Sequence, residues 1–312
     1  MSTIIEPKAT LCILCIKRKP LMKGMILVCR VSVIGGDLRQ LTLSELMTKD
    51  GYDVKVIGFG ENSISSKYRT AKDINEASKS EIIILPMPVT LDYKTINAPF
   101  ENKPIYLEEL AEVISKDSLI LGGRITKELY DLFKNNKCID YYNREELMIK
   151  NAVPTAEGAI EIAMAETPIT LSESKCLIIG YGRIGKVLSH LLKSLGADVT
   201  VSARKYSDLA WIDINGYKSV HNDNLKSIAN KFDLIFNTAP ALILDEEILK
   251  RIAPECVVID LASKPGGVDF AKARDLGLKV IWALSLPGKC APISSGKIIK
   301  ETILNILHEE GV

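Results

Sequence analysis

Three glycines near the middle of the chain are the residues whose spacing points most clearly to a chemical role. Gly180, Gly182 and Gly185 form a G-x-G-x-x-G pattern between an apolar run at residues 176–179 and an amphipathic run at residues 183–195. At such a strand-to-helix turn, the first glycine permits a tight bend and the second lets the backbone approach a pyrophosphate. The third glycine lets the helix pack closely on the strand. The pattern therefore predicts a dinucleotide site, and a glycine-rich turn without a ligand is the alternative.

The strand after the glycines bears on which nucleotide is bound. Residues 198–202 are expected to form it, and an NAD-binding protein usually carries an acidic residue about 20 residues beyond the glycines. No carboxylate stands at the end of this strand, where Ser202, Arg204 and Lys205 offer a hydroxyl group and two cations. These groups pair well with a 2′-phosphate. We therefore expect NADP, with NAD as the alternative if Arg204 and Lys205 belong to an ordinary solvated loop.

Other loops should complete the cofactor site, because open α/β sheets bind ligands at the carboxyl ends of their strands. Small residues follow an expected strand at residues 233–236, and two later loops rich in glycine and proline, at residues 260–267 and 286–292, should frame the nicotinamide end. The cofactor-binding residues predicted in this way are Gly180, Gly182, Arg183, Ile184, Gly185, Ser202, Arg204, Lys205, Thr238, Ala239 and Pro240.

Composition excludes several other classes of function. The 40 basic and 39 acidic residues nearly balance, so no field attracts nucleic acid. No apolar run reaches the ~18–20 residues that span a bilayer. The seven cysteines are odd in number and scattered, which indicates a reducing cytoplasm. Cys12 and Cys15 form a C-x-x-C pair, but no second pair follows at zinc-site spacing, and we predict no metal site.

Alternating strand-like and helix-like runs predict an α/β protein with two doubly wound parallel-sheet lobes, the second of which is the Rossmann domain. The 312 residues suit two domains of ~100–200 residues each. In chain order, we expect a disordered extension at residues 1–24, a flavodoxin-like substrate lobe at 25–150, a crossover helix at 151–170, the Rossmann domain at 171–290, and a terminal helix at 291–312 that packs back on the first lobe. The true start of the protein could be Met1, Met22 or Met25.

Five sequence segments together resemble those of the dipicolinate synthase A-subunit family of spore-forming bacteria. They are V-I-G-G-D-L-R-Q at residues 33–40, N-A-V-P-T-A-E-G at 151–158, the glycine pattern, D-L-A-S-K-P-G-G at 260–267 and L-P-G-K-C-A-P at 286–292. The resemblance covers nearly everything from residue 26 onward. Lys264 departs from it, since the family often has arginine at this position, and lysine keeps the charge but lacks the bidentate fork.

The resemblance implies NADP-linked oxidation of dihydrodipicolinate to dipicolinate, together with a flavoprotein-like B subunit. It also implies a small dicarboxylate substrate, which needs cationic or N–H-rich partners. We expect a homo-oligomer. The proposed substrate-binding residues are Arg39, Asp37, Thr155 and Lys264, the proposed catalytic residues are Glu157 and Lys289, and Arg124 and Arg144 are weaker candidates for binding the substrate. Thr155 and Glu157 have a plain alternative, which is to cap the crossover helix.

Two other functions remain alternatives. D-2-hydroxyacid dehydrogenases share the two-lobe plan but use a catalytic histidine. His190, His221 and His308 are the histidines of this chain, and their positions in the sequence do not suit that role. Hydride loss that produces an aromatic ring needs such a base far less than hydride loss that produces a carbonyl. A regulatory protein that senses NADP(H) without turnover is the other alternative.

Overall fold

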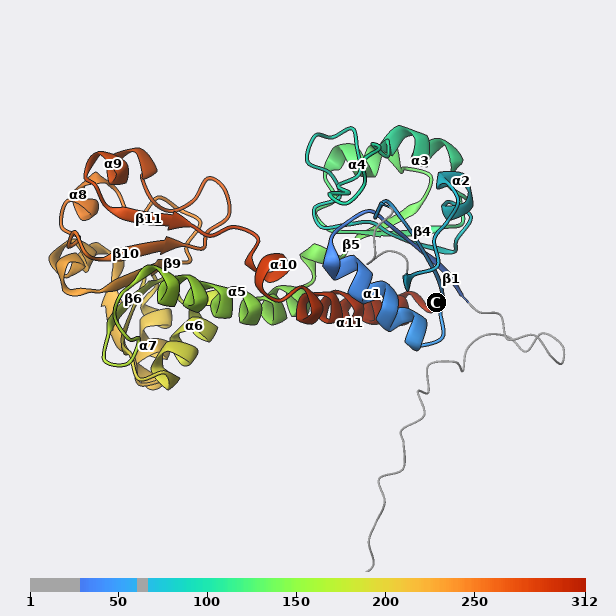
Figure 1. The fold of residues 1–312 in the computed structure, drawn as a ribbon. Helices are drawn as coiled ribbons and strands as arrows, with labels where there is room; N and C mark the ends of the chain where they lie inside the picture. The colour runs from blue at the N-terminus through green and yellow to red at the C-terminus, as the bar shows by residue number, and fades with distance from the viewer. Residues whose placement is uncertain (1–28, 61–66) are drawn as a thin grey trace, which may run out of the picture.

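The computed structural model describes residues 29–60 and 67–312. Two lobes lie side by side and are linked by two helical segments, α5 (Glu145–Glu166) and the stretch from α10 (Leu286–Cys290) to α11 (Pro292–Glu310) (Figure 1). The predicted extension, and with it Cys12 and Cys15, lies outside the described residues.

The first lobe contains a five-stranded parallel sheet in the order β2-β1-β3-β4-β5. Its strands are β1 (Arg30–Ile34), β2 (Asp53–Ile57), β3 (Ile82–Ile84), β4 (Leu119–Gly122) and β5 (Lys137–Asp140). β3 consists of three isoleucines, all buried, as expected for a strand with both faces covered. The strand order is that of flavodoxin-like folds.

The second lobe contains a six-stranded parallel sheet in the order β11-β10-β9-β6-β7-β8. Its strands are β6 (Lys175–Ile179), β7 (Asp198–Ala203), β8 (Lys218–His221), β9 (Leu234–Asn237), β10 (Val257–Asp260) and β11 (Lys279–Trp282). The order reverses between β6 and β9, as in Rossmann folds. The structure thus confirms two doubly wound α/β lobes. The edge strand β8 was not predicted, because Val220 is its only aliphatic residue.

Helices cover both faces of each sheet (Figure 1). In the first lobe they are α1 (Leu38–Lys49), α2 (Ile74–Ala77), α3 (Leu107–Val113), α4 (Lys127–Leu132) and the 3₁₀ turn η3 (Tyr141–Asn143). In the second lobe they are α6 (Arg183–Ser194), α7 (Tyr206–Ile214), η4 (Asn222–Ser227), η5 (Ala229–Lys231), α8 (Glu246–Leu249) and α9 (Phe270–Asp275). No described helix is both long enough and apolar enough to cross a membrane.

The crossover helix corrects one expectation. α5 begins at Glu145, so Pro154 and Thr155 lie in its interior rather than near its start. The hydroxyl group of Thr155 donates a hydrogen bond to the carbonyl of Asn151, one turn back, and so it does not cap the helix. The prediction failed because proline is most frequent in the first turn of a helix, whereas here tertiary packing tolerates the lost backbone bond.

The last two helices fasten the second lobe to the first. α11 packs along α1, and Ile299, Ile303 and Ile306 are buried in the core of the first lobe. Gly296 allows this contact, because a Cβ atom there would lie 2.5 Å from the carbonyl oxygen of Arg39. The segment before α11, predicted to be a loop, contains the short helix α10.

Candidate nucleotide and substrate site

The three glycines of the pattern form a compact turn between β6 and α6. Gly180 has a φ of 99°, and a Cβ atom on it would lie 2.6 Å from Oγ1 of Thr238. A Cβ atom on Gly185 would lie 2.1 Å from the carbonyl oxygen of Gly180. Gly182 differs, because a Cβ atom there would have no atom within 4 Å. Gly180 and Gly185 are therefore required by the protein's own packing, and Gly182 borders open space.

The N-terminus of α6 faces this open space. Gly182 is the N-cap residue, and no side chain caps the helix. The first N–H groups, including those of Arg183 and Ile184, are therefore available to an anion, and the helix dipole favours negative charge there. The turn thus fits a pyrophosphate. The guanidinium group of Arg183 pairs with Glu145 of α5 at 2.6 Å, so Arg183 offers its backbone rather than its side chain.

The loop after β9 braces the glycine turn. The backbone N–H and the hydroxyl group of Thr238 both donate to the carbonyl of Ile179, at 2.9 and 3.0 Å. The N–H of Ala239 donates to Oδ1 of Asn237 at 3.2 Å, and Pro240 is exposed and has no N–H. Thr238, Ala239 and Pro240 therefore lie at the strand reversal but contribute shape more than free hydrogen-bonding groups.

Two cations stand where β7 ends and α7 begins. Arg204 and Lys205 are exposed, and within the described residues neither side chain makes an ion pair. The carbonyl of Arg204 is 2.9 Å from Nε2 of His221, whose ring stacks on Tyr206. Ser202 is fully buried, and its Oγ has no partner. Its expected contact with a phosphate therefore does not hold in this structure, because both faces of β7 are covered and side chains on either face are buried.

Sequence reasoning did not single out the side chains of Asn237 and Asp260, which end β9 and β10. These residues face each other in the strand register, and the amide Nδ2 of Asn237 donates to Oδ1 of Asp260 at 2.8 Å. Asp260 also accepts bonds from the N–H groups of Ala262 and Gly267. One buried carboxylate therefore holds the loop after β10 and joins it to the loop after β9. Their position at two adjacent strand ends was the signal that could have indicated this role.

Arg39 and Asp37 form a tight pair at the start of α1. Nε and Nη2 of Arg39 bind the two oxygens of Asp37 at 2.9 and 2.8 Å, and Nη2 also donates to the carbonyl of Met87. Asp37 caps α1 as well. The Arg39 side chain is only 11% exposed, and these bonds leave Nη1 as its unused group. Asp37 is thus committed to Arg39 and to the helix, so binding a carboxylate falls to Arg39.

Packing between the lobes brings α10 onto this pair. A Cβ atom on Gly288 would lie 3.1 Å from Nε of Arg39 and 3.4 Å from Oδ2 of Asp37. Lys289, the next residue, is exposed, and so is Lys264 on the loop after β10. The fold therefore packs the backbone of α10, next to Lys289, on Arg39, which lies at the other end of the sequence. Both lie by the junction of the lobes.

The remaining candidates lie farther from these contacts. Glu157 is exposed on α5, next to Gly158, which packs against Leu286 and Cys290 of α10. Arg124 lies 4.7 Å from the centre of the Tyr142 ring and has a φ of 60°. Arg144 pairs with Glu146 and Glu309, and the Glu309 carboxylate raises its pKa. Arg144 therefore ties α5 to α11 and is not free to bind a substrate.

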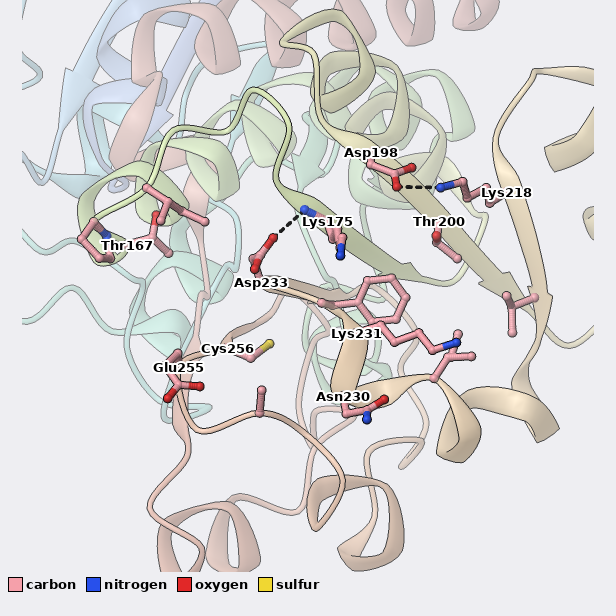
Figure 2. Close-up of a pocket in the computed structure, with 16 residues that line it drawn as sticks. Thr167, Lys175, Asp198, Thr200, Lys218, Asn230, Lys231, Asp233, Glu255 and Cys256 are labelled. Atoms are coloured by element: carbon pink, nitrogen blue, oxygen red, sulfur yellow. Dashed lines mark hydrogen bonds and ion pairs between the residues drawn. The ribbon is translucent and has the colours of Figure 1, made fainter.

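One cavity lies elsewhere in the second lobe. It has a volume of about 900 Å³ and opens at the amino ends of the second sheet's strands, among Lys175, Asp198, Lys218 and Asp233 (Figure 2). Lys218 pairs with Asp198 at 2.6 Å, and the N–H of Lys175 donates to Asp233. Ligands of open α/β sheets bind at the opposite edge, so we assign the nucleotide to the glycine turn. Within the described residues, no cluster of histidine, cysteine and acidic side chains could hold a metal ion.

The glycine turn, the reversal of strand order beside it and the second α/β lobe define the class. The chain has the two-lobed fold of NAD(P)-dependent oxidoreductases. Two family models match it: residues 30–142 match the N-terminal domain of the dipicolinate synthase A subunit, and residues 151–264 match the NAD binding domain of D-isomer specific 2-hydroxyacid dehydrogenases.

Whole-chain comparisons narrow the assignment. The A subunit of dipicolinate synthase from Bacillus subtilis is 31% identical over 290 residues, which are 91% of this chain and 98% of that protein. Crystal structures of this subunit from B. subtilis and Bacillus halodurans superpose with TM-scores of 0.82 and 0.83, each at 30% identity, covering 91% of this chain and 97% and 99% of theirs. The chain belongs to the dipicolinate synthase A-subunit family. A transhydrogenase from Sinorhizobium meliloti, at 14% identity and a TM-score of 0.67 over 90% of this chain and 94% of its own, shares the fold.

Proposed function

We propose that the protein catalyses the NADP-dependent oxidation of dihydrodipicolinate to dipicolinate during sporulation. The observation that carries the proposal is the contact of Gly288, the neighbour of Lys289, with Arg39 in a two-lobed chain of this family. A dicarboxylate needs cations at the place where two lobes meet, and this junction supplies them.

The reaction transfers two electrons. The dihydropyridine ring gives up one hydride and one proton, and the ring becomes aromatic. NADP⁺, when bound, accepts the hydride. The protein must therefore orient a dianion, exclude water and provide a route for one proton.

We assign these tasks to residues at the junction of the lobes and on the loop after β10. Lys289 and Lys264 are proposed to bind the two carboxylates of the substrate, and Arg39 to support one of them through Nη1 while Asp37 holds its orientation. Glu157 is the proposed proton acceptor, because it is an exposed carboxylate on the helix that crosses between the lobes. Thr155 lies on the same helix and would act through shape, since its hydroxyl group already donates to Asn151.

The preference for NADP rests on Arg204 and Lys205, whose side chains are exposed at the end of β7 and make no ion pair with the described residues. A 2′-phosphate would neutralise these two cations, whereas a bare hydroxyl group would leave them unused. We further propose that a flavoprotein-like B subunit works with this chain and that the chain forms a homo-oligomer.

A direct assay tests the proposed function. Purified protein is mixed with NADP⁺ and freshly generated dihydrodipicolinate, with and without the B subunit, while the absorbance of the reduced nucleotide and of the pyridine product is followed. Both signals should rise together in equal amounts. Nucleotide binding without turnover under either condition would instead support a regulatory role. The Lys289→Ala variant should lose activity, and Lys289→Arg should keep more of it, because the charge is retained.

A further inference from the structure

Asp260 carries a buried negative charge at the carboxyl end of β10. Its side chain is 0% exposed. Among residues 29–60 and 67–312, no lysine, arginine or histidine lies within ion-pair distance of it. Buried charges are usually paired with opposite charges, so the burial of this carboxylate without a cation requires an explanation.

The hydrogen bonds around Asp260 identify its charged form. Oδ1 accepts bonds from Nδ2 of Asn237 at 2.8 Å and from the N–H of Ala262 at 3.0 Å, and Oδ2 accepts one from the N–H of Gly267 at 2.8 Å. The orientation of the Asn237 amide is set by Ala239, whose carbonyl accepts from Nδ2 and whose N–H donates to Oδ1. All three groups that contact Asp260 are donors. A carboxyl group that only accepts hydrogen bonds is ionised.

The strand order places this charge in the half of the sheet that receives the nicotinamide. A dinucleotide crosses the reversal between β6 and β9, with its pyrophosphate at the glycine turn. The cations of Arg204 and Lys205 assign the adenosine half to β7, so the nicotinamide half lies over β9 and β10. Asp260 and Asn237 are the last residues of these two strands and are paired in register. Since Asn237 is neutral, the buried charge at the ends of these two strands is that of Asp260.

We propose that Asp260 favours the oxidised nucleotide over the reduced one at this site. The nicotinamide ring of NADP⁺ is positively charged and that of NADPH is neutral, so a fixed negative charge nearby stabilises only the first. At a separation on the order of 10 Å, with an effective dielectric constant of about 20, this attraction corresponds to roughly a tenfold difference in affinity. The proposal rests on the nucleotide site proposed above. Its consequence is that the enzyme binds its oxidant tightly and releases the reduced product readily.

Dissociation constants for NADP⁺ and NADPH, measured by calorimetry without substrate, test the proposal. Asp260→Asn should weaken NADP⁺ binding about tenfold and change NADPH binding less than threefold. Asp269→Asn is the matched control, because Asp269 lies on the same loop after β10 but caps α9. Its ratio of NADP⁺ to NADPH affinity should stay that of the wild type. If Asp260→Asn weakened the binding of NADP⁺ and NADPH equally, Asp260 would have a merely structural role and the proposal would be overturned. No change in either dissociation constant would also overturn it.

Two further measurements keep the proposal testable if Asp260→Asn fails to fold. The wild-type protein should bind NADP⁺ more tightly than NADPH, and the reverse order would refute the idea. The double variant Asp260→Asn/Asn237→Asp moves the carboxylate to the adjacent strand and keeps a donor opposite an acceptor between the two side chains, at the cost of the bond from residue 237 to the carbonyl of Ala239. This variant should restore the wild-type ratio of NADP⁺ to NADPH affinity. A ratio that strongly favours NADPH would contradict the proposed effect of the negative charge. A wild-type protein that binds neither nucleotide would refute the proposed nucleotide site itself.

Discussion

Gly182 and Gly185 lie three residues apart, yet replacing each of them with alanine should have different consequences. At Gly182 a new Cβ atom enters empty space, and the backbone is extended, with φ −81° and ψ −161°. At Gly185 the Cβ atom would lie 2.1 Å from a backbone carbonyl oxygen that cannot easily move. The structure therefore predicts that Gly182→Ala folds normally and that Gly185→Ala does not.

Opposing effects set the size of the change at Gly182. A lower entropy of the unfolded chain stabilises alanine by about 0.4–1 kcal/mol, and alanine at an N-cap costs about 0.5–1.5 kcal/mol relative to glycine. The net change in the free energy of unfolding should stay below about 1 kcal/mol, which shifts Tm by less than about 3 °C. Overpacking in Gly185→Ala should lower the free energy of unfolding by at least about 1–3 kcal/mol.

Nucleotide binding should weaken in both variants. In Gly182→Ala the methyl group occupies the space into which the pyrophosphate must come, and the loss of one charge-assisted hydrogen bond, about 1.5–3 kcal/mol, weakens binding roughly tenfold to hundredfold. Thermal unfolding without nucleotide and calorimetric titration with NADP⁺ measure the two effects separately. If Gly182→Ala binds NADP⁺ like the wild type, the pyrophosphate does not lie at this turn. A large loss of stability in Gly182→Ala would show that the space is not open.

Three further changes have defined outcomes. Arg204→Asp should weaken NADP⁺ binding at least tenfold and leave NAD⁺ binding nearly unchanged, and a constant ratio would show that Arg204 does not contact the 2′-phosphate. Gly288→Ala should displace Arg39, raise KM for the dicarboxylate severalfold and leave nucleotide affinity unchanged; equal effects on both would contradict this assignment. Burial raises the pKa of Cys176 to about 11 and of Cys256 to about 12. Because these thiols bind protons more tightly in the folded state, the free energy of unfolding should fall as pH rises from about 9 toward 12. Urea unfolding at several pH values measures this free energy. Replacing both cysteines with alanine should reduce its fall with pH.

A matched control for the Arg204 variant is Arg251→Asp. Arg251 is also exposed, but it precedes β10, at the amino end of the sheet and away from the glycine turn. The Arg251→Asp substitution makes the same change of charge and should leave the ratio of NADP⁺ to NAD⁺ affinity unaltered. If it shifts the ratio as much as Arg204→Asp does, the effect reflects net charge rather than contact.

Most of the fold could be read from local pattern. Buried parallel strands such as β3 and β10 are short apolar runs between helices, and their period and composition are visible in the chain. The exposed edge strand β8 carried too few apolar residues to be recognised. The start of α5 was misplaced, because proline is a weak guide when packing against neighbouring helices stabilises the rest of a helix.

The candidate site was predictable only where chemistry follows from adjacent residues. The glycine turn is of this kind, since the spacing of its glycines between an apolar strand and an amphipathic helix is visible in the chain. Ser202 looked equally suitable in the sequence, yet it is buried because both faces of β7 are covered. Whether Arg204 and Lys205 are free of ion pairs depends on side chains that lie far away in sequence.

The sequence by itself determined the nucleotide turn and the two α/β lobes, because both depend on local spacing and on the alternation of strands and helices. Tertiary structure alone decided that Arg39 reaches the carbonyl of Met87, that Gly288 packs on Arg39 and Asp37, and that Asp260 is buried among N–H donors without a cation. These contacts join residues separated by 23 to 251 positions, or depend on the path of a folded loop, and no local pattern encodes which distant groups a charged side chain will meet.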